Sequence, residues 1–257
     1  YDISANVSTL KNKVTSLGIG KDSYIAGAYA TYVGQEIGQF YGWVYKGIAR
    51  TEDDLANNAV QQGANVGDCL YEDISGPNGE PDGVIDAYDQ TVLGSGLPKV
   101  NFGLSTHMEY KGFDLNISTY GVLNYHVSDD IYNSLNSCYG YGNKEVGMLD
   151  ANRWSEDGST YLSSVPRTYA ANNATLAWND LFSSRKIQNA AYWKIANVEL
   201  GYNFPDKWFG GYVSGVRLYV SAQNLYTFTG YHGYNVDYAG GTFTPGYNFC
   251  SFPSART

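Results

Sequence analysis

Four aspartates in one stretch of the chain have the type and spacing best suited to a chemical role. They lie in a segment rich in glycine and proline: Asp73, Asp82, Asp86 and Asp89. Carboxylate oxygens are hard ligands of the kind that Ca²⁺ or Mg²⁺ prefers. The pattern resembles an EF-hand loop only loosely, because the insertion at residues 77–81 breaks the EF-hand spacing. The alternative, which we favour, is a turn network in which Asp side chains bind nearby backbone groups.

A second candidate site is aromatic. Rings that could stack on sugars occur in segments expected to be loops: Trp154, Trp178, Tyr231 and Tyr234, together with Tyr139 and Tyr141. The alternative is that these rings pack the loops together or contact a partner protein, because tyrosine is enriched at protein interfaces. We favour packing and partner contact over sugar stacking.

No catalytic constellation is evident, so we predict no catalytic residue. His107, His126 and His232 are scattered, with no pair at helical ligand spacing, and no GxSxG nucleophile elbow occurs. Cys69, Cys138 and Cys250 form no CxxC or Cys/His ligand pattern. We expect all three cysteines in long loops and assign no disulfide.

Alternation of apolar and polar residues predicts the strands that must position these groups. We expect about six strands of 8–15 residues: 1–8 running on towards 17, 34–48, 98–110, 113–121, 192–204 and 216–228. Lys111 and Gly112 form an expected two-residue hairpin turn. Segments 50–97, 124–189 and 230–257 are expected to be long loops. Lys194 interrupts an apolar face, where we expect it to snorkel, and Tyr226, Phe228 and Tyr231 suggest a ring of aromatics at a membrane interface.

Composition narrows the class of protein. The chain has 257 residues, 16% aromatics and a net charge of -9, so it lacks the basic footprint that nucleic-acid binding needs. No apolar run approaches the roughly 20 residues of a membrane helix. Membrane β-strands alternate, so averaged hydropathy does not reveal them.

Several segments resemble, in family order, motifs of the SusC/RagA family of TonB-dependent outer-membrane transporters. The matching stretches include GQEIGQFYGWV at 34–44, DGVIDAYD at 82–89, YKGFDL at 110–115, RLYVSAQNL at 217–225 and FPSART at 252–257. Two positions depart from the family pattern, because Glu36 stands where proline is usual and Lys46 where an acidic residue is usual. The matches span almost the whole chain.

This resemblance implies an all-β fold, namely an antiparallel transmembrane β-barrel fragment with long extracellular loops. Barrels of this class have 22 strands and a plugged lumen. Residues 1–257 would form the C-terminal part of the barrel, with the plug domain and the final strand outside this chain. An open sheet edge is not tolerated in lipid, so the remainder of the same barrel must complete it.

The resemblance also implies a function, which is TonB-dependent import of a glycan or oligopeptide. The location would be the outer membrane of a Gram-negative, Bacteroidetes-like bacterium. Expected partners are a SusD-like surface lipoprotein, TonB acting through the missing N-terminal part, and the lipid bilayer, with no nucleic acid.

Two other classes of protein remain open at this point. A soluble all-β carbohydrate-binding module would show similar alternation, but with its apolar face sealed inside. A glycan-processing enzyme ranks last, because no strand-borne carboxylate pair of the required kind is evident. The positions of Phe102, Leu115 and Leu218 decide between an outward and a sealed apolar face.

Overall fold

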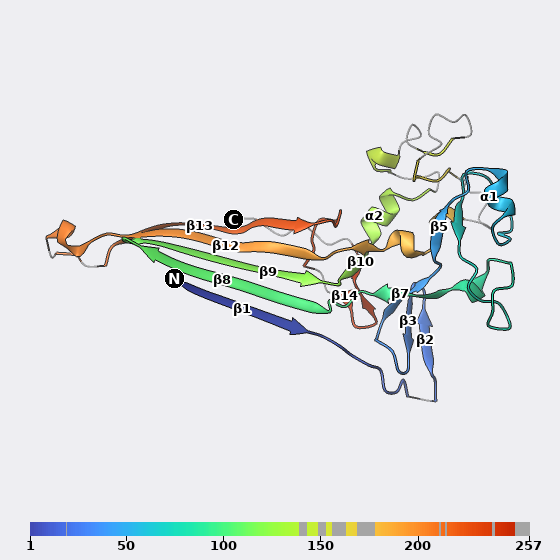
Figure 1. Ribbon diagram of the computed structural model, residues 1–257, viewed down its shortest axis with the longest axis horizontal. Helices are drawn as coiled ribbons and strands as arrows, with labels where there is room; N and C mark the ends of the chain where they lie inside the picture. Colours follow the sequence, from blue (N-terminus) through green and yellow to red (C-terminus); the bar gives the residue numbers. More distant parts are fainter. Residues whose placement is uncertain are drawn as a thin grey trace.

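The fold is known from a computed structural model. It describes residues 1–18, 20–138, 143–148, 153–155, 163–168, 178–210, 212–213, 215–237 and 240–249. The molecule is elongated, with one long sheet at one end and a group of short strands and helices at the other (Figure 1).

The long sheet has five antiparallel strands in the order β1-β8-β9-β12-β13. They are β1 (Asp2–Thr9), β8 (Val100–Tyr110), β9 (Phe113–Leu123), β12 (Tyr192–Asn203) and β13 (Arg217–Thr229). Four of the five have 11–13 residues, enough to cross a hydrocarbon core at a tilt. The sheet is open, because β1 and β13 are its edge strands.

Connections at the two ends of the long sheet differ in length. Tyr110 pairs with Phe113 across Lys111 and Gly112, whose φ angles of 50° and 86° identify the expected tight turn. The link from β12 to β13, which includes η6 (Asp206–Phe209), lies at this same end (Figure 1). The described residues of the longer segments, within 10–99, 124–191 and 230–249, lie at the opposite end, which we call the loop-bearing end (Figure 1).

The two faces of the long sheet differ in chemistry. Leu104 pairs with Ala5 and Thr119, and Leu200 pairs with Leu115 and Val220, so the apolar residues align across all five strands. This apolar face is not sealed inside a core. The side chains of Leu104, Leu200 and Leu218 are 41%, 46% and 68% exposed, and Phe102 and Leu115 are partly exposed.

A β-bulge between Ile195 and Asn197 corrects the expected position of Lys194. The extra residue reverses the alternation along β12. Trp193 and Ile195 therefore share the apolar face with Leu200, while Lys194 points to the polar face. Lys194 is buried there, and the prediction that it snorkels from the apolar face is wrong.

Short strands and helices occupy much of the sequence that was expected to form either a continuous strand or irregular loops. A four-stranded sheet has the order β2-β3-β4-β7, and its members are β2 (Ser23–Ala26), β3 (Tyr29–Tyr32), β4 (Gln39–Gly42) and β7 (Thr91–Ser95). The strands β5 (Tyr45–Ile48) and β6 (Cys69–Tyr71) form a pair. The expected strand at 34–48 is thus two short strands, and the expected extension of the first strand towards residue 17 is wrong, because β1 ends at Thr9.

The later short strands and the helices complete the loop-bearing end. β10 (His126–Asp129) lies between β11 (Gln188–Asn189) and β16 (Tyr247–Asn248), and β14 (Gly240–Gly241) pairs with β15 (Thr244–Pro245). The helices are α1 (Glu52–Ala56) and α2 (Asp130–Leu135), with 3₁₀ turns η1 (Ala87–Asp89), η2 (Val146–Met148), η4 (Trp178–Asp180) and η5 (Ser184–Lys186). In the part of the chain that the structure describes, no helix is both long and apolar enough to cross a membrane.

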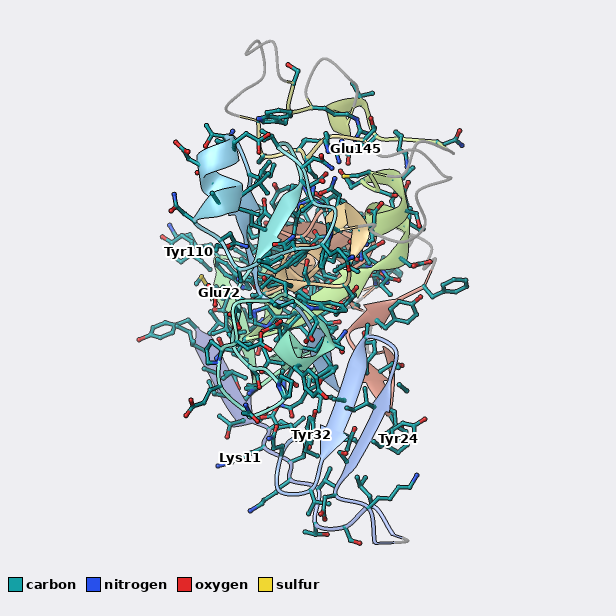
Figure 2. The ribbon with its side chains drawn as sticks, turned by 90° about the vertical axis from the view of Figure 1, so that its right-hand side faces the viewer. Lys11, Tyr24, Tyr32, Glu72, Tyr110 and Glu145 are labelled. Carbon is teal, nitrogen blue, oxygen red and sulfur yellow. The ribbon has the colours of Figure 1, made fainter. Side chains whose placement is uncertain are left out.

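Two small cores stabilise the loop-bearing end. One joins it to the long sheet and contains Val122, Tyr125, Val127, Ala190, Tyr192, Tyr231 and Val236. The other lies farther out and contains Cys69, Tyr71, Ile85 and Trp178. Figure 2 looks onto this end, with Lys11, Tyr24 and Tyr32 towards one side and Glu145 towards the other.

Candidate functional site

The polar face of the long sheet carries an ion network near the short-turn end. Nη2 of Arg217 lies 2.5 Å from Oδ1 of Asp114 and 2.5 Å from Oε1 of Glu199. The Asn203 amide donates to Asp114 Oδ2 at 3.0 Å. Gly201 leaves the space for this crossing, because a Cβ there would meet both Asp114 and Arg217. The network joins β9, β12 and β13 through one buried carboxylate.

Lys194 holds the segment that follows β13 against the same face. Its ammonium forms an ion pair with Asp237, and it lies 5.6 Å from the centroid of the Tyr120 ring. Burial of Lys194 is compatible with its charge because Asp237 and the ring supply partners. The segment after β13 therefore folds back over the polar face rather than away from it.

Asp129 joins three segments where the loop-bearing end meets the long sheet. Its carboxylate caps α2 by accepting from the Tyr132 backbone N–H at 2.9 Å. It also accepts from the Tyr231 hydroxyl and from the Asn248 amide, the latter at 3.0 Å. Burial and the Asp129 carboxylate raise the pKa of the Tyr231 phenol, which stays protonated and can donate. The expectation that Tyr231 belongs to an aromatic interface ring is wrong, because Tyr231 is buried in the inner core.

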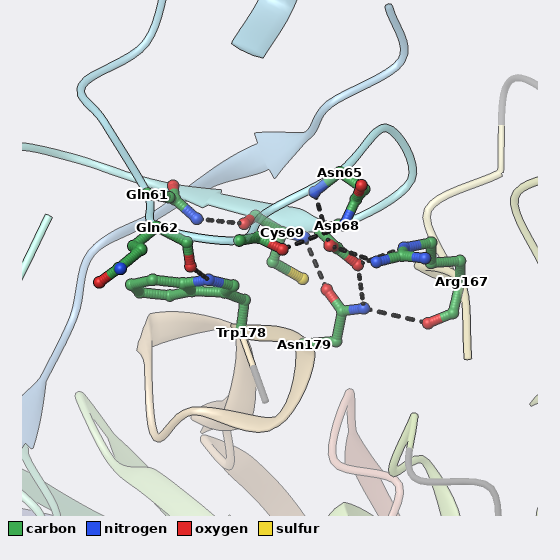
Figure 3. Close-up of polar contacts among 9 residues, drawn as sticks. Gln61, Gln62, Asn65, Asp68, Cys69, Arg167, Trp178 and Asn179 are labelled. Atoms are coloured by element: carbon green, nitrogen blue, oxygen red, sulfur yellow. Dashed lines mark hydrogen bonds and ion pairs between the residues drawn. The ribbon is translucent and has the colours of Figure 1, made fainter. Parts of the chain in front are cut away.

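The outer core depends on a second buried carboxylate, that of Asp68 (Figure 3). Arg167 binds it through two bonds of 2.7 and 2.8 Å, and the Asn179 amide donates to it at 2.8 Å. The Asn179 carbonyl oxygen in turn accepts from the Cys69 backbone N–H at 2.7 Å. Residues more than ninety positions apart in sequence are fixed together by this network.

The four aspartates of the candidate metal site bind backbone N–H groups. Asp73 accepts from Asp82 and Gly83, Asp82 from Val84, and Asp86 from Tyr88. Asp89, which is fully buried, accepts from the backbone of Ile74, Ser75 and Asp86. The described residues contain no group of three or more acidic, His or Cys side chains placed to hold a metal. This geometry is that of the turn network, and a bound Ca²⁺ or Mg²⁺ stays a prediction.

The candidate aromatic residues have different environments. Trp178 packs in the outer core and donates its indole N–H to the Gln62 carbonyl oxygen, and Trp154 is buried as well. With Tyr231 also buried, Tyr234 is the most accessible of the four, at 65% exposure. Tyr139 and Tyr141 lie outside the described residues. Burial of three of the four rings matches the packing role.

The cysteines and histidines provide no reactive centre in the described part of the chain. Cys69 and Cys138 are buried free thiols, and Cys69 belongs to β6 rather than to a loop. Burial raises the pKa of the Cys69 thiol to about 12, which keeps it protonated and unreactive. Cys250 lies outside the described residues. His232 stacks on Tyr132, and His107 bonds to Asn116 on the polar face.

The three carboxylates that organise the structure were not identified from sequence: Asp68, Asp114 and Asp129. Their partners in distant segments lie 89–119 residues away, so local spacing contains no sign of those contacts. One signal was available for Asp114, which occupies the polar phase of an alternating strand beside a tight turn. This signal predicted that Asp114 lies on the polar face of the sheet, but it did not predict that Arg217 is its partner.

An antiparallel sheet with an exposed apolar face, a polar face, short turns at one end and long loops at the other is the wall of a membrane β-barrel. The outer face also carries an aromatic group at the loop-bearing end, where Trp193 and Phe228 stack with ring centroids 5.4 Å apart and Tyr226 lies beside them. Such rings are typical of a membrane interface.

Comparison with known proteins agrees with this class. The chain is 30% identical over 244 residues to the TonB-dependent receptor P3 of Formosa agariphila, covering 91% of this chain and 23% of that protein. It is 25% identical over 250 residues to the TonB-dependent receptor SusC of Bacteroides thetaiotaomicron, covering 91% of this chain and 22% of SusC. The chain thus spans about a quarter of the length of the curated relatives it matches. No family model matches it.

Solved structures show the same fold. The RagAB peptide importer in its closed-closed state matches with a TM-score of 0.74 and 21% identity, over 99% of this chain and 26% of that chain. A second structure of the RagAB peptide transporter gives a TM-score of 0.71 at 23% identity, over 95% and 25%. The chain is a β-barrel segment homologous to TonB-dependent receptors of the SusC/RagA type, which confirms the resemblance seen in its motifs.

The two faces predict opposite responses to a lysine. Leu104→Lys places a charge on the lipid side, where lysine near the bilayer midplane costs about 2–4 kcal/mol. Ser105→Lys, one residue away on the polar face, is the matched control and should be nearly neutral. The folded fraction of the full-length barrel in outer membranes, measured by its heat-dependent shift in gel mobility, should fall only for Leu104→Lys. Equal losses for both variants would contradict the assignment of faces.

The Asp68 network predicts a local effect. Asp68→Ala leaves the Arg167 guanidinium and the Asn179 amide without their carboxylate, a loss of about 1–3 kcal/mol in local stability. Hydrogen exchange in the segment 65–71 should therefore accelerate. Glu80→Ala, an exposed acid in the neighbouring loop, is the control and should leave this segment unchanged. Unaltered exchange in Asp68→Ala would show that the network does not hold the outer core.

Proposed function

We propose that the protein containing this chain imports nutrients across the outer membrane in a TonB-dependent manner, together with a SusD-like surface lipoprotein. This chain forms part of the barrel wall and part of the outer mouth. The work is binding, gating and translocation, and we assign no catalytic residue. The cargo class proposed is a glycan or an oligopeptide.

The single observation that carries this proposal is the pairing of an apolar outer face with a charged inner face on one sheet. Asp114, Arg217 and Glu199 line the inner side, opposite Leu115 and Leu200. Charged groups of this kind suit a plugged, water-containing lumen rather than a protein core. The named relatives are receptors and transporters, which supports the same reading.

The exposed apolar face of the long sheet also argues against a soluble carbohydrate-binding module. A sandwich needs its apolar face buried against a second sheet, whereas Leu218 and Val220 are each 68% exposed. A glycan-processing enzyme is disfavoured because the Asp114 and Glu199 carboxylates both bind Arg217. Neither carboxylate is then free to act as acid or nucleophile.

Partners and location follow as parts of the proposal. The edge strands β1 and β13 would pair with the rest of the same barrel, and TonB would act through parts of the protein outside this chain. The exposed Tyr234 ring at the loop-bearing end is a suitable contact for cargo or for the lipoprotein. The location would be the outer membrane of a Bacteroidetes-like bacterium.

Gene deletion and energy coupling test the function. Deleting the gene should abolish uptake of one class of labelled oligosaccharide or oligopeptide, and the intact gene should restore it only in cells with a working TonB system. The tagged full-length protein should fractionate with outer membranes and co-purify with a surface lipoprotein. Restoration of uptake in cells that lack TonB would refute energised import.

A further inference from the structure

A pocket of about 310 Å³ lies at the loop-bearing end, between α2, β5 and η5. Its walls include Tyr45, Tyr132, Asn133, Asn136, Arg185 and Lys186, with residues 164–165 on a further side. No acidic side chain is among the described residues that line it. The volume is at the lower end of the range for small-ligand sites.

Backbone contacts hold two walls of the pocket in place. The Ser184 N–H donates to the Trp43 carbonyl oxygen at 3.0 Å, and the Tyr45 N–H donates to the Ser184 hydroxyl at 3.0 Å. These bonds fix η5 against β5. On the other side, the buried Asp129 carboxylate caps α2. The pocket is therefore built from anchored elements, which lowers the entropic cost of binding.

Charges around the pocket leave one cation without a counter-ion. Lys186 lies 3.8 Å from the Asp180 carboxylate and donates to the Asp180 carbonyl oxygen at 2.5 Å. Arg167 takes the Asp68 carboxylate. The Arg185 guanidinium, by contrast, has no hydrogen bond or ion pair with any residue in the described ranges.

Lys186 lies close enough to Arg185 to interact with it electrostatically as a like charge. The other groups that interact with Arg185 are neutral at physiological pH. They are the thiols of Cys69 and Cys138 and the phenols of Tyr45 and Tyr71. Burial raises the pKa of all four groups. A guanidinium stays charged throughout this range, so Arg185 keeps an unbalanced positive charge beside the pocket.

We propose that this pocket binds a carboxylate group of the transported cargo, with Arg185 as its charged partner. The planar guanidinium matches a carboxylate through two parallel hydrogen bonds, and the Asn133 amide, which donates one hydrogen to the Ser128 hydroxyl, has a second hydrogen for the ligand. The Asn136 amide already donates to the Tyr132 carbonyl oxygen and to the Glu145 carboxylate. The rings of Tyr45 and Tyr132 provide apolar contact for the rest of the bound residue. Such a carboxylate belongs either to a uronic acid or to a peptide. The inference rests on the proposed import function and narrows its cargo.

The pocket is lined by two cationic side chains, whereas the chain as a whole has a net charge of -9. Its attraction for an anion is therefore local, and binding depends on direct contact with Arg185 rather than on long-range steering. Added salt should then weaken binding only modestly, because partly buried pairs are screened less than exposed ones.

Binding to the purified full-length transporter in detergent tests the proposal. Calorimetry would compare a galacturonic acid tetrasaccharide with its carboxyl-reduced neutral form, and a short peptide with its C-terminally amidated form. At least one charged probe should bind roughly tenfold or more tightly than its neutral counterpart. The arm that shows this preference identifies the source of the carboxylate.

Single substitutions test whether the tighter binding of the charged probe comes from this pocket. Arg185→Gln should remove the preference for the charged probe. Arg185→Lys keeps the positive charge but cannot form two parallel hydrogen bonds, so it should retain only part of that preference. Lys207→Gln, an exposed cation at the short-turn end, is the matched control and should retain it in full. Should Arg185→Gln fail to fold, Arg185→Lys and the probe comparison on the unaltered protein still decide.

Equal affinity for charged and neutral probes in both arms, or a preference that survives in Arg185→Gln, would overturn the proposal. Either result leaves TonB-dependent uptake of cargo in cells unaffected. The failure of this inference is therefore distinguishable from a failure of the proposed import function.

Discussion

A side chain on the five-stranded sheet reaches either hydrocarbon or water, because successive residues of a strand point to opposite faces. A shift of one residue would exchange the two environments for every side chain that follows it. The bulge at Ile195 and Asn197 makes this shift once, and it places Lys194 beside Asp237 instead of in lipid. An ammonium on the lipid side would otherwise face a cost of a few kcal/mol. The remaining contacts of the polar face depend on this alternation.

The sequence predicted the parts of the fold that depend on local pattern. The β8–β9 hairpin was anticipated almost to the residue, because strict alternation and a Lys-Gly turn are local signals. The bulge was missed, since one inserted residue resembles an imperfect strand rather than a change of face. The short strands at the loop-bearing end were missed for another reason. Strands of two to five residues form only because distant segments pair with them, as β5 does with β6.

The candidate sites also divide into features set by local sequence pattern and features set by contacts between distant segments. Asp73, Asp82 and Asp86 bind backbone groups within ten residues, which is the turn chemistry that their spacing indicated. Trp178 was named as a loop ring that could stack on sugar, with packing of the loops as the favoured alternative, and it is buried because Tyr71 and Ile85 lie against it in the outer core. Such burial depends on partners about a hundred residues away. The sequence gives no sign of a role for Arg185, because the lack of a counter-ion is a property of three-dimensional packing alone.

Two buried carboxylates give the loop-bearing end its order, and they act at different depths. Asp68 joins segments of the outer core through Arg167 and Asn179. Asp129 joins α2 to Tyr231, which follows β13, and to Asn248 of β16. A buried carboxylate that accepts several bonds is most stable when every partner is present, so the ordering of one segment favours the ordering of the others. Since α2 forms one wall of the Arg185 pocket, the position of that wall is set by the end of the barrel strand. A ligand held in the pocket would therefore contact an element tied directly to the barrel wall, rather than a loop that moves independently of it.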